Sequence, residues 1–216
     1  MLKQSELPTR PFLYPIIDTG VCSGRGIDPV ALCDAYVAGG ARVLQLRDKG
    51  RSSAQFLRLA DALVLRANAA GAVLIINDRA DIARLSSAPG IHVGQDDLPV
   101  SEVRKLLPAE AIVGLSTHDI DQIEHAFAQD ATYVAVGPVF ATSTKDTGYS
   151  ARGLDLVRQA AGRGKPIVAI GGLTIDNLSD VVRAGASGVA VITDLLQGDP
   201  ESRARAFIAR LADLRS

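Results

Sequence analysis

The sequence predicts a single-domain (β/α)8 barrel, the TIM-barrel class of α/β fold. Short apolar runs rich in β-branched residues alternate with stretches of helical spacing, and eight such units occur along the chain. Each unit takes about 27 of the 216 residues, the size expected for one strand–helix repeat. Hydrophobic residues make up 47% of the chain and aromatic residues only 4%, which suits parallel strands covered by helices.

The elements follow this alternation from one end of the chain to the other. Strands are predicted at Phe12–Ile17, Val43–Leu46, Val73–Ile76, Gly90–Val93, Ile112–Leu115, Tyr133–Val136, Ile167–Ile170 and Gly188–Ile192. Helices are predicted over 28–39, 52–70, 79–86, 99–107, 119–129, 153–163, 175–184 and 200–214. Asp28-Pro29 and Ser101-Glu102 have the composition of helix starts. Gly39-Gly40, Gly71 and Gly185 lie where helices should end.

An open, doubly wound sheet would show the same alternation of strands and helices. It is disfavoured because no G-x-G-x-x-G follows the first strand and because eight units are the number that closes a barrel. We therefore expect residues 12–216 to form one catalytic barrel, preceded by a flexible tail over residues 1–11.

Composition excludes several partners. The formal net charge is −1, from 23 basic and 24 acidic residues, so no nucleic acid or anionic membrane surface is expected to bind. The chain has no apolar run of the ~20 residues needed to span a bilayer, and the first eleven residues lack the apolar core of a signal peptide. Two cysteines, Cys22 and Cys33, are too few for a disulfide framework. These features predict a cytoplasmic protein, and its oligomeric state is left open.

Polar residues follow most of the predicted strands, and in such barrels chemistry occurs at the carboxyl ends of the strands. The second strand continues into Gln45, Arg47 and Lys49, which share one face because side chains alternate along a strand. That face should point toward the barrel mouth. A buried arginine needs an anion, so Arg47 should meet either a bound phosphate or a carboxylate such as Asp48 or another aspartate.

Two aspartates follow the third and fourth strands, where the sequence reads Ile76-Asn77-Asp78-Arg79 and His92-Val93-Gly94-Gln95-Asp96-Asp97. Asp78 and Asp97 should therefore lie near each other, and hard carboxylate oxygens are the ligands that Mg²⁺ prefers. The alternative is that each aspartate caps the helix that follows it. The nearby cations Arg47 and Lys49 favour a metal–diphosphate site.

Hydroxyl groups follow the fifth and sixth strands. Ser116 and His118 follow the fifth, and the role of His118 is left open, whereas His92 within the fourth strand is expected to be a core histidine. After the sixth strand, the hydroxyls of residues 142–144 precede Lys145, a combination suited to phosphate oxygens. The loop over 141–152 is longer than usual and is a candidate lid.

The last two strands lead into a second candidate anion site. Gly171-Gly172 follows the seventh strand and lets a ligand approach the backbone closely. Ile192 and Thr193 end the eighth strand, and the loops after these two strands commonly bind phosphate in barrels of this class. Two separate anion sites suit a reaction between two phosphorylated molecules.

With these motifs in place, the sequence closely resembles the thiamine-phosphate synthase family from Tyr14 to about Leu196. The motifs that carry the resemblance are QLRDK at 45–49, INDR at 76–79, HVGQDD at 92–97, GLSTH at 114–118, GPVFATSTK at 137–145 and AIGG at 169–172. Each motif alone is weak, but six in the family's order at the expected strand ends are specific.

The resemblance implies a transferase of thiamine biosynthesis that joins a pyrimidine diphosphate to a thiazole phosphate, or to its carboxylated form, with Mg²⁺. It implies that the pyrimidine diphosphate contacts Gln45, Arg47, Lys49, Asn77, Ser116 and Lys145. It implies that Asp78 and Asp97 bind Mg²⁺, and that the thiazole phosphate contacts Thr142, Thr144, Gly172, Ile192 and Thr193. Catalysis would rest on the cations Arg47, Lys49 and Lys145, which stabilise the leaving diphosphate.

Three alternatives compete with this interpretation. A thiazole tautomerase on the same barrel should have lost parts of the diphosphate and metal apparatus, which this sequence retains. A sugar-phosphate epimerase or isomerase would need an acid–base pair around a carbon centre. A catalytically silent binding barrel would have little reason to keep inward-facing charges that cost stability.

Overall fold

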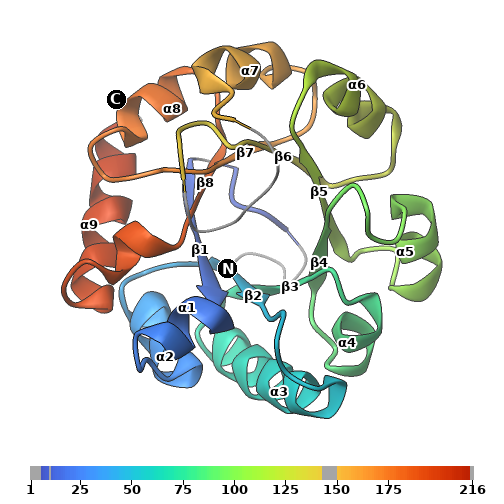
Figure 1. Cartoon of the computed structure of the whole chain (residues 1–216), viewed down its shortest axis with the longest axis vertical. Helices are drawn as coiled ribbons and strands as arrows, with labels where there is room; N and C mark the ends of the chain where they lie inside the picture. Colours follow the sequence, from blue (N-terminus) through green and yellow to red (C-terminus); the bar gives the residue numbers. More distant parts are fainter. Residues whose placement is uncertain (1–5, 10, 143–149, 215–216) are drawn as a thin grey trace.

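The eight strands form a closed, all-parallel barrel in the order β1 to β8, with helices around its outside (Figure 1). This computed structural model describes residues 6–9, 11–142 and 150–214. The strands are β1 Phe12–Asp18, β2 Val43–Arg47, β3 Val73–Asn77, β4 Gly90–Val93, β5 Ile112–Thr117, β6 Tyr133–Val136, β7 Ile167–Ile170 and β8 Gly188–Val191. The helices are α1 Thr19–Gly24, α2 Pro29–Ala38, α3 Ser53–Ala69, α4 Ala80–Leu85, α5 Val100–Leu106, α6 Ile120–Ala128, α7 Gly153–Ala160, α8 Leu178–Arg183 and α9 Pro200–Asp213, with a 3₁₀ turn η1 at Thr193–Leu196.

The predicted barrel is confirmed, and each predicted strand and helix is present with ends shifted by a few residues. Two helical segments, α1 and η1, were not predicted. The α1 helix begins because the Asp18 carboxylate accepts a hydrogen bond of 3.0 Å from the backbone N–H of Val21. Its six residues include two glycines, so propensity and periodicity give no sign of it, and η1 is too short to show a period.

The predicted helix boundaries are partly confirmed. Asp28 caps α2 by accepting hydrogen bonds from the backbone N–H groups of the next turn. Gly71 and Gly185 have positive φ angles of 66° and 107° just beyond α3 and α8, which is the conformation that glycine permits at helix ends. Ser101 is not a cap as the sequence suggested, because α5 starts one residue earlier, after Pro99.

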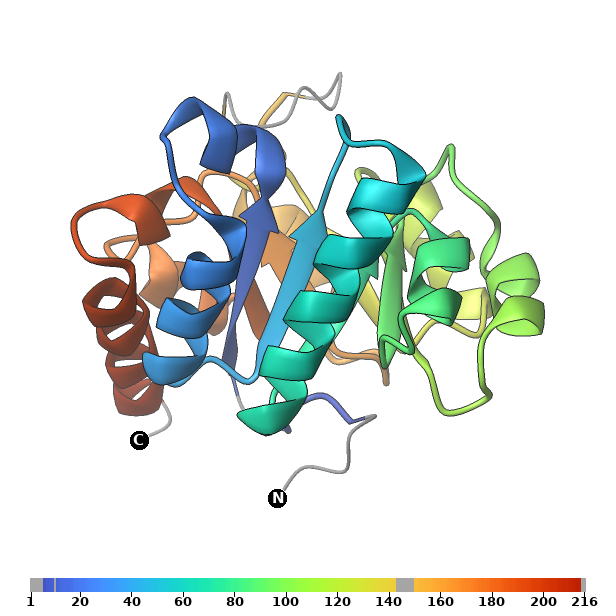
Figure 2. The same ribbon diagram turned by 90° about the horizontal axis from the view of Figure 1, so that it is seen from below.

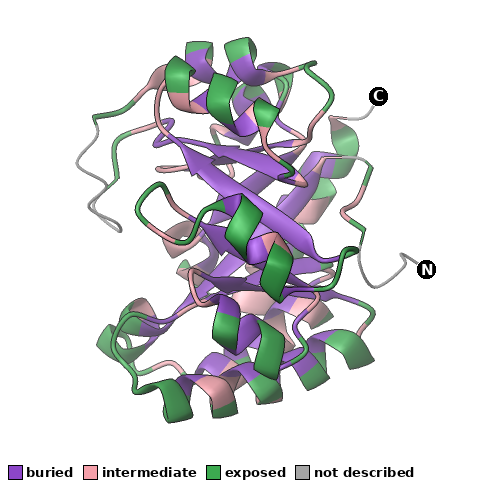
Figure 3. Cartoon of the chain, turned by 90° about the vertical axis from the view of Figure 1, so that its right-hand side faces the viewer, coloured by how far each residue is buried: buried purple, intermediate pink, exposed green. Residues whose placement is uncertain are grey.

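Alternation along each strand divides the apolar side chains into two cores. One set fills the barrel interior and includes Tyr14, Ile75 and Tyr133. The other set, including Leu44 and Leu46, packs between the strands and the helices. The strands are buried except for Arg47 and Ile170 at the ends of β2 and β7, whereas each helix buries one face and exposes the other (Figure 3).

The parallel arrangement brings the carboxyl ends of all eight strands to one end of the barrel, and α1 lies over that end (Figure 2). The loops that follow the strands therefore surround one opening, as the fold class requires. Within the described residues, no helix has the length and apolar character that crossing a membrane requires.

Candidate active site

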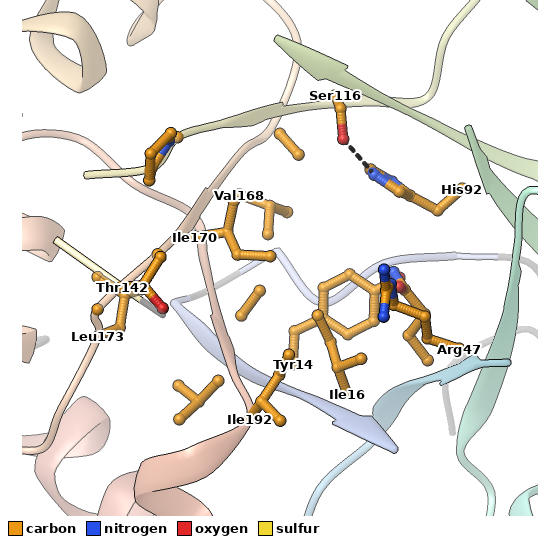
Figure 4. A pocket seen from close by; sticks show the side chains of 18 of the residues that line it. Tyr14, Ile16, Arg47, His92, Ser116, Thr142, Val168, Ile170, Leu173 and Ile192 are labelled. Atoms are coloured by element: carbon orange, nitrogen blue, oxygen red, sulfur yellow. Dashed lines mark hydrogen bonds between the residues drawn. The ribbon is translucent and has the colours of Figure 1, made fainter. Parts of the chain in front are cut away.

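A cavity opens at the carboxyl ends of the strands (Figure 4). Eight of the residues that the sequence assigned to substrate binding line it, namely Gln45, Arg47, Asn77, Ser116, Thr142, Gly172, Ile192 and Thr193. They come from β2, β3, β5 and the segments after β6, β7 and β8. The apolar part of the wall is formed mainly by Ile16, Ala135, Val168, Ile170 and Ala190. A pocket with an apolar wall and a few converging polar groups is typical of a small-molecule site.

Strand β2 presents its polar face to this cavity, as predicted. Leu44 and Leu46 point outward into the core beneath the helices. Gln45 and Arg47 point inward and line the cavity. Gln45 is almost completely buried, and its Nε2 donates a hydrogen bond of 3.0 Å to the hydroxyl of Tyr14.

Arg47 forms an ion pair with Asp18, at the end of the neighbouring strand β1. The sequence predicted either a phosphate or an aspartate as its partner, and the structure assigns Asp18 rather than Asp48, which binds Arg51 at 2.7 Å instead. Asp18 uses its other carboxylate oxygen to cap α1. Arg47 Nε is buried without a hydrogen-bond partner in the described part of the chain.

Asp78 and Asp97 lie together, with Lys49 paired to Asp78. Burial raises the pKa of Asp97, and the neighbouring Asp78 carboxylate raises it further. Neither aspartate caps a helix, because the residues that precede α4 and α5 are Arg79 and Pro99. The capping alternative is therefore wrong. Two adjacent carboxylates repel each other, and a cation between them removes this cost.

The backbone holds Asp78 in an unusual conformation. Its φ angle is 63°, in the left-handed region that residues other than glycine seldom adopt. Its N–H donates a hydrogen bond of 2.7 Å to the carbonyl oxygen of His92 in β4. Strain of this kind concentrates at functional sites, where the surrounding structure maintains it. Lys49, Asp78 and Asp97 follow β2, β3 and β4 but stand apart from the lining of the cavity described above.

Two histidines also line the cavity. His92 is buried and hydrogen-bonded through both ring nitrogens, to Tyr133 Oη at 2.9 Å and to Ser116 Oγ at 2.8 Å. It is therefore a hydrogen-bonded core histidine, as the sequence suggested, but its ring also reaches the cavity wall (Figure 4). His118 has Nδ1 at 2.5 Å from the carbonyl oxygen of Gly137, which ties the segment after β5 to the segment after β6.

The segments after β6 and β7 pack tightly against each other. A Cβ on Gly172 would lie 2.6 Å from the carbonyl oxygen of Ala141 and 2.8 Å from Cβ of Phe140, so only glycine fits there. Asn177 Nδ2 donates a hydrogen bond of 2.9 Å to the carbonyl oxygen of Gly172 and stabilises this turn. Thr142 lies across the cavity from Arg47 (Figure 4). Ser143, Thr144 and Lys145 lie outside the described residues, as do most residues of the predicted lid over 141–152.

Tyr14, Tyr133 and Asp18 contact the site residues but were not identified from the sequence. Tyr133 reaches the hydroxyl of Tyr14 at 2.9 Å from a position 119 residues away in the chain. The sequence could show only that the two tyrosines carry a hydroxyl at inward positions of their strands, and this does not reveal which residue each hydroxyl contacts. Burial raises the pKa of both tyrosines well above the ordinary value, so both remain protonated hydroxyls at neutral pH.

The chain is similar to known proteins over nearly its whole length. The family model described as thiamine monophosphate synthase matches residues 13–195. Thiamine-phosphate synthase of Methanoculleus marisnigri is 40% identical over 202 residues, covering 93% of this chain and 95% of the relative. Thiamine-phosphate synthase of Acidothermus cellulolyticus is 42% identical over 205 residues, covering 93% and 94%.

Among solved structures, a thiamine phosphate pyrophosphorylase from Pyrococcus furiosus superimposes with a TM-score of 0.86 at 25% sequence identity, covering 95% of this chain and 97% of that one. Fold, family model and relatives agree, and the chain belongs to the thiamine monophosphate synthase family.

Proposed function

We propose that the protein is a transferase of thiamine biosynthesis that joins 4-amino-2-methyl-5-hydroxymethylpyrimidine diphosphate to a thiazole phosphate, or to its carboxylated form, and releases thiamine phosphate and diphosphate. The observation that carries this proposal is the convergence of eight predicted binding residues on one cavity in a chain of this family. The tautomerase alternative finds no support among the relatives, which are named as synthases.

The two substrates divide the site between them. Gln45, Arg47 and Asn77 line the side of the cavity formed by β2 and β3, and we assign them, with Lys49, Ser116 and Lys145, to the pyrimidine diphosphate. Gly172, Ile192 and Thr193 line the side that follows β7 and β8, and we assign them, with Thr142 and Thr144, to the thiazole phosphate. The positive φ of Gly172 (63°) supports this assignment, because a glycine turn lets a ligand approach the backbone closely.

Mg²⁺ fits the donor set at Asp78 and Asp97. The two carboxylates lie close enough for Asp78 to raise the pKa of Asp97, and a divalent cation would relieve this repulsion. In the described part of the chain, no cluster of three or more His, Cys, Asp or Glu side chains forms a complete protein cage. Mg²⁺ at Asp78 and Asp97 would therefore have to take its remaining ligands from water and diphosphate. When bound there, Mg²⁺ would neutralise charge on the diphosphate.

The chemistry follows from charge placement. The bond between the methylene carbon and the diphosphate oxygen breaks, and its electron pair leaves with the diphosphate. Arg47 and Lys49, which we include with Lys145 as catalytic residues, stabilise that charge from the end of β2. The thiazole nitrogen then supplies its lone pair to the resulting cation and forms the new C–N bond. With a carboxylated thiazole, CO₂ is released as well. The apolar wall around Ile16 and Val168 limits access of water to the cation.

We also propose that the protein acts in the cytoplasm. Cys22 and Cys33 are both buried free thiols, as expected for a reducing compartment. Burial raises the pKa of the Cys22 thiol to about 11, which keeps it protonated and unreactive.

The experiment that tests the function is a direct assay. Purified protein is mixed with both phosphorylated substrates, with and without Mg²⁺, and thiamine phosphate is followed by fluorescence after oxidation. We expect product formation that requires both substrates and Mg²⁺ and is lost in the presence of a chelator. Absence of product, with the thiazole isomerised or merely bound, would instead support a tautomerase or a binding barrel.

A further inference from the structure

A chain of hydrogen bonds crosses the barrel interior and ends at the cavity. Gln45 Nε2 donates to Tyr14 Oη at 3.0 Å, and Tyr14 Oη lies 2.9 Å from Tyr133 Oη. Tyr133 Oη lies 2.9 Å from Nδ1 of His92, whose Nε2 lies 2.8 Å from Ser116 Oγ. Five side chains from five different strands thus form one continuous path, whose last bond appears in Figure 4.

The amide at one end fixes the direction of the first bond and favours one direction for the rest of the path. An amide nitrogen can only donate, so Tyr14 Oη accepts and is free to donate its own hydrogen to Tyr133. In this direction, Tyr133 in turn donates to Nδ1 of His92. A neutral imidazole that accepts at Nδ1 carries its proton on Nε2, so it donates to Ser116.

Ser116 is the last residue of the path, and the bond direction decides whether its hydroxyl hydrogen is available to a ligand. In this direction, its Oγ accepts from His92, so its own hydrogen takes no part in the path. Ser116 lines the cavity, and its hydroxyl has no second partner within the described residues. If the path ran the other way, Ser116 would donate its hydrogen to His92, and only its oxygen lone pairs would be available to a ligand.

We propose that Tyr133 and His92 are positioning residues that hold the Ser116 hydroxyl as a hydrogen-bond donor to an acceptor atom of the pyrimidine diphosphate. This inference rests on the proposed contact between Ser116 and that substrate. Tyr133 is fully buried and is absent from the lining of the cavity, so it acts on the ligand only through the lining residues that it contacts, His92 and Tyr14. Gly114, which is paired with Tyr133 across the β5–β6 register, leaves the space that the tyrosine ring fills.

The first test determines the direction of the hydrogen bonds at His92 in the substrate-free protein. The full chain is labelled with ¹⁵N-histidine, and long-range ¹H–¹⁵N correlation spectra distinguish the tautomers of its three histidines. His92 is assigned by the signal lost in His92→Gln. We expect Nδ1 without a proton and Nε2 with one. A proton on Nδ1 would reverse the path and overturn the proposal, whatever the outcome of any kinetic experiment.

The second test is a double-mutant cycle on the steady-state constants. Tyr133→Phe removes only the hydroxyl, and we expect it to raise KM for the pyrimidine diphosphate about tenfold while kcat changes less, the scale of one hydrogen bond. In a Ser116→Ala background the same substitution should change KM less than about twofold, because the hydroxyl that the path holds in place is gone. Tyr36→Phe is the matched control: Tyr36 is a fully buried tyrosine whose hydroxyl has no partner within the described residues.

The outcomes separate the inference from the function on which it rests. Additive effects of the two substitutions, alongside a clear loss in Ser116→Ala, would overturn the path from Tyr133 but keep the substrate contact. An unchanged KM in Ser116→Ala would overturn the contact and the inference with it, while thiamine phosphate formation by the wild-type protein would still stand. The NMR result decides the direction even where Tyr133→Phe fails to fold, which circular dichroism would reveal.

Discussion

The ring of Tyr133 occupies the space beside Gly114. A Cβ on Gly114 would lie 2.1 Å from Cζ and 2.4 Å from Oη of Tyr133, closer than any real contact, and the two residues are direct partners in the β5–β6 register. Because Gly114 has no side chain, a large aromatic residue fits at the centre of the barrel. That residue in turn connects Tyr14 to His92 and fixes the interior polar path.

We expect Gly114→Ala to destabilise the protein by about 1–3 kcal/mol, the usual cost of adding a carbon to a filled core. The measurement is urea unfolding followed by circular dichroism. Gly24→Ala is the control, because a Cβ there meets no atom within 4 Å and its φ is not positive. Equal stability of the two variants would show that the Tyr133 ring has room to move.

Asp78→Asn should lower kcat by at least ~10², the scale of losing one preorganised electrostatic element. Asparagine tolerates the left-handed φ of 63° at this position, so the substitution removes charge without adding backbone strain. Thermal unfolding supplies a second measurement: Mg²⁺ should raise the Tm of the wild-type protein but not that of the variant. Asp96→Asn, at an exposed aspartate next to Asp97, should behave like wild type. A full Mg²⁺ response in Asp78→Asn would remove Asp78 from the metal site.

Asp18→Asn should lower kcat/KM for the pyrimidine diphosphate about tenfold, because Arg47 would lose the partner that holds its guanidinium in place. Asparagine still caps α1, which separates this effect from loss of the helix. Asp34→Asn breaks an exposed ion pair with Arg66 and serves as the control. A kcat/KM equal to that of wild type, or higher, would mean that Asp18 only competes with the diphosphate for Arg47.

Gly172→Ala should raise KM for the thiazole phosphate about tenfold, the scale of losing one or two backbone hydrogen bonds. The added carbon would push against Ala141 and Phe140, and would displace the turn assigned to the phosphate. Gly198→Ala is a close control, since it has a similar positive φ of 78° but meets no atom within 4 Å. If Gly172→Ala has the same KM as Gly198→Ala, crowding at Gly172 has no part in binding of the thiazole phosphate.

The amino-acid sequence was enough to predict the barrel and most of the residues that line the cavity. Strand and helix periods are local properties, and parallel strands must bring their carboxyl ends together, so the inward positions Gln45 and Arg47 and the strand-end residues Asn77 and Ser116 could be placed without coordinates. Which polar groups pair with each other could be seen only in the folded structure. Asp18 rather than Asp48 faces Arg47, and Tyr14 meets Tyr133 across the interior, because such contacts depend on register and closure between strands far apart in the chain. Periodicity shows which face a side chain takes, but it carries no information about the partner on that face.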